Sequence, residues 1–399
     1  MTSDRGAPAH LRHAFPWLIA TLICVHACMA VTRVTGSLWV LNHGYGEASV
    51  GLLLSLFAVA PILLSLWAGR LADRHGLHRP VGFGVLMAGV GALLALAVQE
   101  LWAIAIGCLL SGGAVAVAAV AIQREAGLMA GEPGELKRIF SWMALGPALS
   151  NALAPVIAGL LIDHVGMTAA FGLATLLPLL AWALAQKVPR HRPEPFTLSY
   201  REPPAWGLFR LPAFRRLMLV NLVLSACWDA HTFVVPVVGH ARGLSASSIG
   251  FVLGSFAVAA TCVRLAIVRF ADDIDEITSL RIAMMVAMLT FLAYAWLPGT
   301  AGLMVGSALL GTALGSVQPM ILAMMHRVTP VERHGQALGL RMLFINGATV
   351  AMPAGFGLLA AATALAAPMW LMASLLALAQ TVARRLGTDV HAEGSLHSR

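Results

Sequence analysis

Two ionisable side chains interrupt apolar stretches that are otherwise long enough to leave water. Arg33 is the only charged residue between positions 13 and 46, and Asp229 is the only one between 217 and 241. A charge near the middle of such a stretch costs ~2.5–3.5 kcal/mol on membrane-insertion scales, so it normally faces a partner or a watered cavity. The chemistry open to these two is a fixed ion pair, or a pair whose carboxylate exchanges a proton.

Other polar residues in the apolar stretches have two interpretations each. His231 follows Asp229 by two residues and could join a proton relay, or it is a packed, hydrogen-bonded core histidine. The uncharged residues could bind a solute or only a neighbouring backbone; they are Asn151, Gln318 and Asn346. Arg264 lies five residues before Arg269, so we expect its side chain to reach the membrane surface and to be structural.

The elements that position these residues are predicted to be membrane-spanning helices. Of 399 residues, 59% are hydrophobic and only 11% are charged, which excludes an ordinary soluble domain. Backbone groups in lipid must be paired internally, so charge-free stretches of about 20 residues form helices that cross the bilayer. We predict twelve spans, near 17–40, 50–68, 80–98, 102–122, 139–162, 168–186, 217–239, 249–268, 282–297, 301–325, 342–361 and 363–383.

The basic residues predict the orientation. If the N-terminus is cytoplasmic, 23 of the 26 Lys and Arg residues fall on the cytoplasmic side. The net charge of +8 is then a topology signal and does not indicate a nucleic-acid partner. Both termini are expected to be cytoplasmic, with a disordered tail after the last span. The five cysteines lie in apolar stretches without metal-type spacing, so neither a metal nor a cofactor is expected.

The chain is predicted to be an internal duplication. A proline-rich stretch, 187–216, separates six spans (1–186) from six more (217–384), and 385–399 form the tail. A shift of 199 residues aligns Phe57 with Phe256 and Gly112 with Gly311, and a shift of 198 aligns Pro155 with Pro353. Because both halves have six spans in the same order and orientation, the repeat is parallel.

The loop between the second and third spans, 69–79, resembles the signature loop of the major facilitator superfamily, Gly-x-x-x-Asp-Arg-x-Gly. The match covers Gly69, Asp73, Arg74 and Gly76. Basic residues usually follow, and here Leu77 and His78 take their place. The resemblance covers essentially the whole chain and implies an all-α membrane protein of twelve helices in two parallel-repeat six-helix halves. Gly69 is expected to allow close helix packing, and Gly76 a turn that a Cβ would resist.

The resemblance also implies a function, which is a secondary transporter working by alternating access. In that fold spans 1, 4, 7 and 10 line a central cavity, so Arg33 and Asp229 would face the transport path. The signature loop would latch the cytoplasmic side, with Arg124 as a candidate partner.

No nucleotide-hydrolysing loop occurs in the sequence, which leaves coupling to a proton gradient or to a solute gradient. Of these two, we expect protons as the coupling ion. No cluster of catalytic residues occurs either, so we expect no enzyme activity. We expect a monomer in a bacterial inner membrane that moves a small organic solute, with export of amphiphiles favoured because polar lining residues are few. The alternatives are an importer of a small polar metabolite and a transporter-like receptor that moves nothing.

Overall fold

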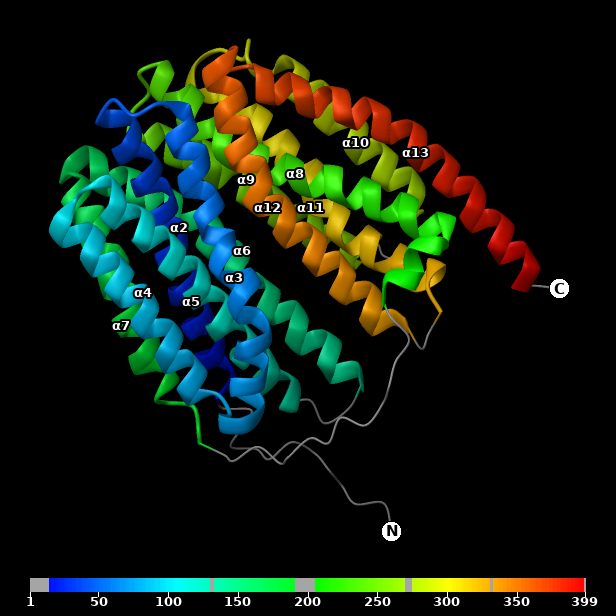
Figure 1. Cartoon of the computed structure of the whole chain (residues 1–399), viewed down its shortest axis with the longest axis horizontal. Helices are drawn as coiled ribbons and strands as arrows, with labels where there is room; N and C mark the ends of the chain where they lie inside the picture. The colour runs from blue at the N-terminus through cyan, green and yellow to red at the C-terminus, as the bar shows by residue number, and fades with distance from the viewer. Residues whose placement is uncertain (1–13, 130–132, 191–204, 270–274, 331–332, 398–399) are drawn as a thin grey trace. The chain divides into compact units, whose positions relative to one another are not determined.

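The computed structural model describes residues 14–129, 133–190, 205–269, 275–330 and 333–397. Every regular element in these ranges is a helix (Figure 1). They are α2 (Phe15–Asn42), α3 (Glu47–His75), α4 (His78–Val98), α5 (Leu101–Leu128), α6 (Pro133–His164), α7 (Met167–Ala185), the 3₁₀ helix η1 (Ala205–Arg210), α8 (Pro212–Ala241), α9 (Ala246–Arg269), α10 (Glu276–Tyr294), α11 (Gly299–Val328), α12 (His334–Ala362) and α13 (Ala367–His397).

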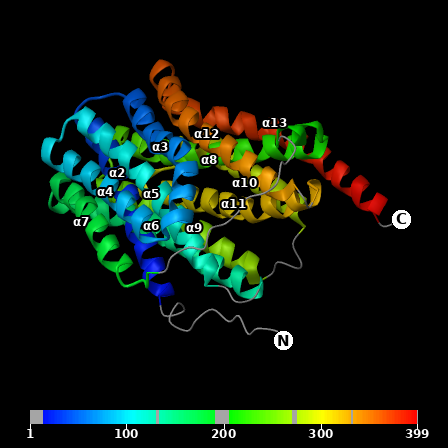
Figure 2. The ribbon, with the colours of Figure 1, turned by 60° about the horizontal axis from the view of Figure 1, so that its bottom comes forward.

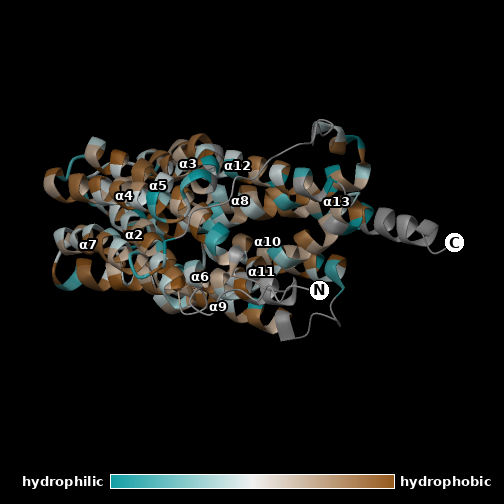
Figure 3. Cartoon of the chain, turned by 90° about the horizontal axis from the view of Figure 1, so that it is seen from below, coloured by the Kyte–Doolittle hydropathy of each residue, from teal (hydrophilic) through white to brown (hydrophobic). Residues whose placement is uncertain are grey.

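The helices are those of a multi-pass membrane protein. Within the described ranges, eleven helices, α2 to α12, are long and apolar enough to cross a bilayer. Figure 3 shows hydrophobic residues running along the length of the helices. The first eleven predicted spans each coincide with one of these helices.

The C-terminal end differs from the prediction. The twelfth predicted span, 363–383, falls on α13, which is not among the eleven candidate spans. The expectation of a disordered tail after residue 384 is wrong for the described part, because α13 continues to His397. Leu386, beyond the predicted span, is still buried, and no proline follows Pro368 to end the helix.

The chain divides into two compact units. Unit 1 comprises Met1–Gly46, Leu52–Leu198 and Gly243–Gly254, and unit 2 comprises Glu47–Gly51, Ser199–Arg242 and Ser255–Arg399. The first turns of α3 and α9 therefore each belong to the unit that does not hold the rest of the helix.

The helices pair in the same pattern in both units. In unit 1, α2 packs on α5, α6 and α7, and α4 packs on α5 and α7 (Figures 1 and 2). In unit 2, α8 packs on α11, α12 and α13, and α10 packs on α11 and α13. The second set is the first with every helix moved on by six. The predicted parallel duplication is thus confirmed at the level of helix packing.

One glycine contact recurs at the predicted shift of 199 residues. A Cβ on Gly112 in α5 would collide with the backbone carbonyl of Phe57 in α3, within unit 1. A Cβ on Gly311 in α11 would collide in the same way with the carbonyl of Phe256 in α9, within unit 2. Small residues are what allow helix backbones to approach closely in a membrane. The two glycines therefore set where the two phenylalanine rings lie.

A carboxylate from α6 caps the start of α9. Asp163 Oδ1 accepts a hydrogen bond from the Ala246 backbone N–H at 2.9 Å, and Oδ2 accepts one from Ser247 at 2.7 Å. These N–H groups have no partner inside their own helix, and the helix dipole is positive there, so an anionic cap is favourable. All three residues belong to unit 1.

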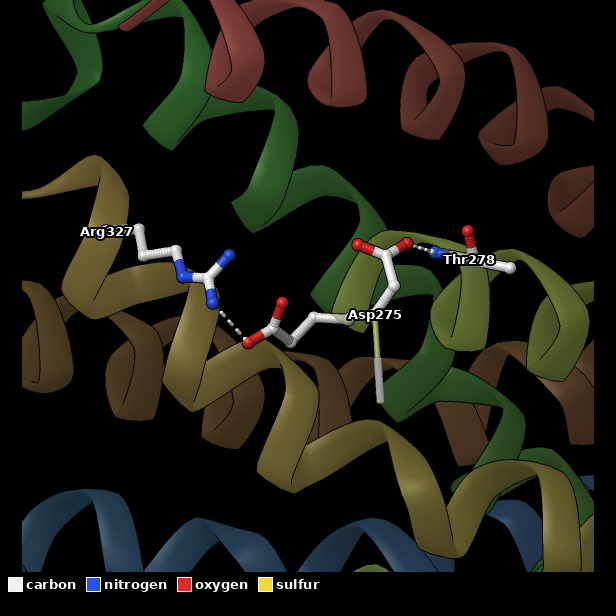
Figure 4. Close-up of polar contacts among 4 residues, drawn as sticks. Asp275, Thr278 and Arg327 are labelled. Carbon is white, nitrogen blue, oxygen red and sulfur yellow. Dashed lines mark hydrogen bonds and ion pairs between the residues drawn. The ribbon is translucent and has the colours of Figure 1, made fainter. Parts of the chain in front are cut away.

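The acidic residues before α10 also act at a helix start. Asp275 Oδ2 accepts from the Thr278 backbone N–H at 2.8 Å, the geometry of an N-cap (Figure 4). The next residue, Glu276, forms an ion pair with Arg327 of α11 at 2.8 Å (Figure 4). Asp275 thus caps α10, and Glu276 joins α10 to α11.

Replacing Gly311 by alanine is expected to lower the thermal stability of the purified protein. The added Cβ meets a backbone carbonyl that cannot rotate away, and overpacking of this kind costs ~1–3 kcal/mol. The matched control is Gly355→Ala in α12, where a Cβ meets no described atom within 4 Å and where alanine favours the helix by up to ~1 kcal/mol. Thermal unfolding in detergent measures both, and equal melting temperatures for the two variants would contradict the packing role.

Candidate functional site

Arg33 lies in the middle of α2 against an aromatic ring. Its side chain is half-buried, and its guanidinium carbon lies 5.2 Å from the centre of the Phe57 ring. Arg33 Nη2 lies 3.9 Å from Sδ of Met29, one turn earlier in α2. A cation over an aromatic face is attracted by ~0.5–2 kcal/mol, more when water is excluded. The ring is available to Arg33 because Gly112 seats the Phe57 backbone.

The equivalent place in unit 2 holds a histidine. His231 of α8 stacks on Phe256, with ring centres 4.2 Å apart and planes 19° from parallel. Trp228 meets the same phenylalanine edge-on at 4.6 Å. The shift of 199 residues relates Phe256 to Phe57 and places His231 next to the counterpart of Arg33. The duplication therefore presents one ring per unit, with an arginine on one and a histidine on the other.

A buried chain of hydrogen bonds fixes His231. Its Nε2 lies 2.9 Å from Oγ of Ser307 in α11, and this Oγ lies 2.7 Å from the hydroxyl of Tyr294 in α10. All three side chains are at most 2% exposed. The chain joins α8, α10 and α11 through groups that would be costly to leave unpaired. This geometry favours the packed core histidine over the relay.

Asp229 lies midway along α8 and is half-buried, with its Oδ2 fully covered. It belongs to unit 2, whereas Arg33 belongs to unit 1. Their pairing, inferred from the repeat, stays a prediction.

The signature loop is described in part. Gly76 ends α3 with a positive φ of 67°, and its N–H donates to the Ala72 carbonyl at 2.9 Å; this is the turn that a Cβ would resist. A Cβ on Gly69 would meet no described atom within 4 Å, so the expected close approach is not found there. Arg74 is exposed and Arg124 is half-buried in the last turns of α5. The side chain of Asp73 lies outside the described residues.

The three uncharged candidates lie on α6, α11 and α12. Asn151 and Asn346 are half-buried and Gln318 is exposed. Within the described residues none of the three makes a side-chain hydrogen bond, and their contact with a solute stays a prediction.

Two arginines in unit 2 contact neutral groups. Arg264 is half-buried; its Nε donates to the Gly315 carbonyl at 3.3 Å, and its guanidinium lies 5.8 Å from the Trp228 ring. Arg341 falls before the predicted span at 342 and was therefore expected in a cytoplasmic loop. It lies inside α12, 5% exposed, with Nε 3.3 Å from Oδ1 of Asn221 in α8. Arg341 lies in the helix because α12 begins two turns before residue 342, at His334, and its neighbour Leu340 is buried as well.

The described residues hold no group of three or more His, Cys, Asp or Glu side chains that could bind a metal ion.

A duplication of six membrane-spanning helices with the same packing pattern is typical of secondary transporters. The family model of the Major Facilitator Superfamily matches residues 18–305, and the chain belongs to this superfamily. It is accordingly a transporter-family protein and not an enzyme.

Similar proteins are transport proteins of several kinds. The tetracycline resistance protein, class B, of Escherichia coli is 30% identical over 138 residues, which is 33% of this chain and 32% of that protein. The match thus spans about a third of this relative. Among solved structures, a POT peptide transporter has a TM-score of 0.79 at 15% identity, covering 95% of each chain. The nucleoside transporter NupG has a TM-score of 0.76 at 12% identity, covering 94% of this chain and 99% of that one. These structural similarities show the fold.

Replacing Ser307 by alanine is expected to destabilise unit 2. The change leaves His231 Nε2 and the Tyr294 hydroxyl without their shared partner in a buried place, which costs ~1–3 kcal/mol for each unsatisfied group. The control is Thr312→Ala on the same helix, because the exposed Thr312 hydroxyl bonds only to its own helix backbone. Thermal unfolding in detergent should show a clear loss for Ser307→Ala alone; an unchanged melting temperature would mean that the chain of hydrogen bonds contributes no stability.

Proposed function

We propose that this protein is a proton-coupled secondary transporter that exports amphiphilic compounds by alternating access. The observation that carries the proposal is the pair of intramembrane charges, Arg33 in the first helix of one half and Asp229 in the first helix of the other. The halves are 1–186 and 217–384, joined by the linker 187–216 and followed by the tail 385–399.

The position of Asp229 supports proton coupling. A carboxylate midway along a membrane-spanning helix is costly in its charged form, and both protonation and a nearby cation relieve that cost. Protonation of Asp229 and pairing of its carboxylate with a cation are alternatives, because a neutral carboxyl group no longer attracts the cation. In the proposed cycle Asp229 pairs with Arg33 in one state and carries a proton in the other, while Arg33 rests on the Phe57 ring.

Two observations support export of amphiphiles. The matched relative confers tetracycline resistance by name, and the uncharged polar side chains available to a solute are few: Asn151, Gln318 and Asn346. An apolar path with few hydrogen-bonding groups suits an amphiphile better than a sugar.

The membrane arrangement proposed for this cycle follows from the charges. The protein would act as a monomer in the bacterial inner membrane with both termini cytoplasmic. The signature loop, Gly69 to Gly76, would latch the cytoplasmic side, with the Asp73 carboxylate meeting Arg124 or the positive end of a helix.

Accumulation of fluorescent dyes and antibiotics in efflux-deficient bacteria tests the proposal. Cells making the wild type should accumulate less than cells with empty vector, and a protonophore should abolish the difference. Asp229→Asn should abolish it too, because the amide cannot exchange a proton. The matched control is Asp275→Asn, which is expected to transport normally because asparagine caps a helix as well as aspartate does.

Other outcomes point elsewhere. If cells with the wild type and cells with empty vector accumulate every compound equally, the proposal of amphiphile export is wrong. Uptake of a polar metabolite then becomes the hypothesis to test. Export that survives both the protonophore and Asp229→Asn would contradict proton coupling. A ligand that binds to purified protein without any flux in vesicles would indicate a receptor.

A further inference from the structure

Arg341 is a buried cation held by a neutral partner. It lies seven residues into α12, inside the segment Gln336–Ala362 that is apolar enough to cross a membrane. Its side chain is 5% exposed. Among the described residues no carboxylate lies within ion-pair distance of it. Buried arginines are almost always paired with an anion, because removing an uncompensated charge from water is expensive.

The hydrogen bond from Arg341 orients Asn221. Nε of Arg341 donates to Oδ1 of Asn221 at 3.3 Å. Because an arginine has only donors, the amide oxygen must face it and the NH₂ group cannot. The orientation of the asparagine is therefore fixed by chemistry. Nδ2 shares its carbon with Oδ1 and so lies beside the guanidinium group.

This arrangement leaves several donors and no acceptor. Asn221 is 2% exposed, and its Nδ2 is fully buried without a hydrogen-bond partner. An orphan donor of this kind costs ~1–3 kcal/mol, which an incoming acceptor would recover. The two Nη nitrogens of Arg341 also make no hydrogen bond with the part of the chain that is described, and neither is fully enclosed. The guanidinium of Arg341 and the amide of Asn221 together favour a ligand with negatively charged oxygen atoms.

Aromatic rings lie along the same two helices. Phe344 follows Arg341 by about one turn of α12, and Phe214 precedes Asn221 by two turns of α8. Between them lies Phe209 of η1, with ring centres 5.3 Å from Phe344 and 5.5 Å from Phe214. Residues three or seven apart lie near the same face of a helix. All five residues belong to unit 2. The surroundings of the cation are thus apolar and aromatic.

We propose that Arg341 and Asn221 bind the carboxylate of an amphiphilic organic anion. The planar guanidinium matches a carboxylate with two parallel N–H bonds, and the freed Asn221 amide supplies a further donor. The apolar body of the ligand lies toward the aromatic side chains. The inference names a substrate class for the proposed transporter and rests on that function for the passage of the ligand. Binding itself requires neither transport nor protons.

Binding of 2-naphthoate to the purified full-length protein, followed by calorimetry in detergent, tests this site. The neutral 2-naphthalenemethanol has the same ring system without the charge, and octyl phosphate offers phosphate oxygens in place of a carboxylate. Wild type should bind 2-naphthoate at least tenfold more tightly than the alcohol. Arg341→Gln should remove that preference. The control is Arg264→Gln, which removes another arginine of unit 2, half-buried and held by a backbone carbonyl, and should keep the preference.

Asn221→Asp gives a second variant that nearly keeps the size and shape of the side chain. The new carboxylate would pair with Arg341, so the protein should melt at a higher temperature and lose its preference for 2-naphthoate. A purely structural pair predicts the higher melting temperature but no anion preference in the wild type.

Equal affinity for the acid and the alcohol in the wild type, with no tighter binding of octyl phosphate, would overturn the proposal. So would unchanged anion binding in Asn221→Asp. Tighter binding of octyl phosphate, lost in both Arg341→Gln and Asn221→Asp, would retain the anion site and assign it to phosphate. Because none of these measurements involves flux or a proton gradient, they can fail while the export assay succeeds, and the reverse.

Discussion

The close contact between a glycine and a phenylalanine carbonyl is the interaction on which the candidate site depends. Helices in lipid gain little from hydrophobic association, so they pack where small residues let backbones approach. Gly112 and Gly311 provide that approach once in each unit. Each fixes a backbone whose ring then carries an ionisable side chain, Arg33 on Phe57 and His231 beside Phe256. The ring contacts of Arg33 in α2 and His231 in α8 thus depend on glycines in two other helices, α5 and α11.

The sequence predicted the parts of the fold that the membrane dictates. Charges are rare within spans, so stretches with at most one charge located eleven helices, and the shift of 199 residues aligned the glycines and phenylalanines that make the repeated contact. Prediction from the sequence failed where side-chain packing determines the position of a residue. A charge at the edge of an uncharged stretch looks like a loop residue, so Arg341 was placed outside its helix. The contact of Arg264 with the Gly315 carbonyl could not be predicted either, because nothing in a linear pattern shows that this carbonyl lies beside it.

Two arginines of unit 2, the half-buried Arg264 and the buried Arg341, contact neutral groups. Arg264 lies against a backbone carbonyl and an indole ring, and Arg341 against an amide. A carboxylate partner would neutralise the cation and leave little field for a ligand, whereas a carbonyl or amide dipole orients it and leaves its charge largely uncancelled. A neutral partner therefore suits an arginine that binds an anion. In a helix without a ligand, the same partner would lower the stability of the protein, because the charge stays uncompensated.

The strength of these contacts also bears on movement. Alternating access requires two states whose free energies differ by only a few kcal/mol, because a deeper minimum would trap the protein in one of them. A buried ion pair kept permanently closed would be such a trap. Arg33 over the Phe57 ring is worth ~0.5–2 kcal/mol, which changes a population by roughly 2- to 30-fold. In the proposed cycle, this is enough to hold the guanidinium on the ring while Asp229 is protonated, and weak enough for it to leave when the carboxylate becomes charged.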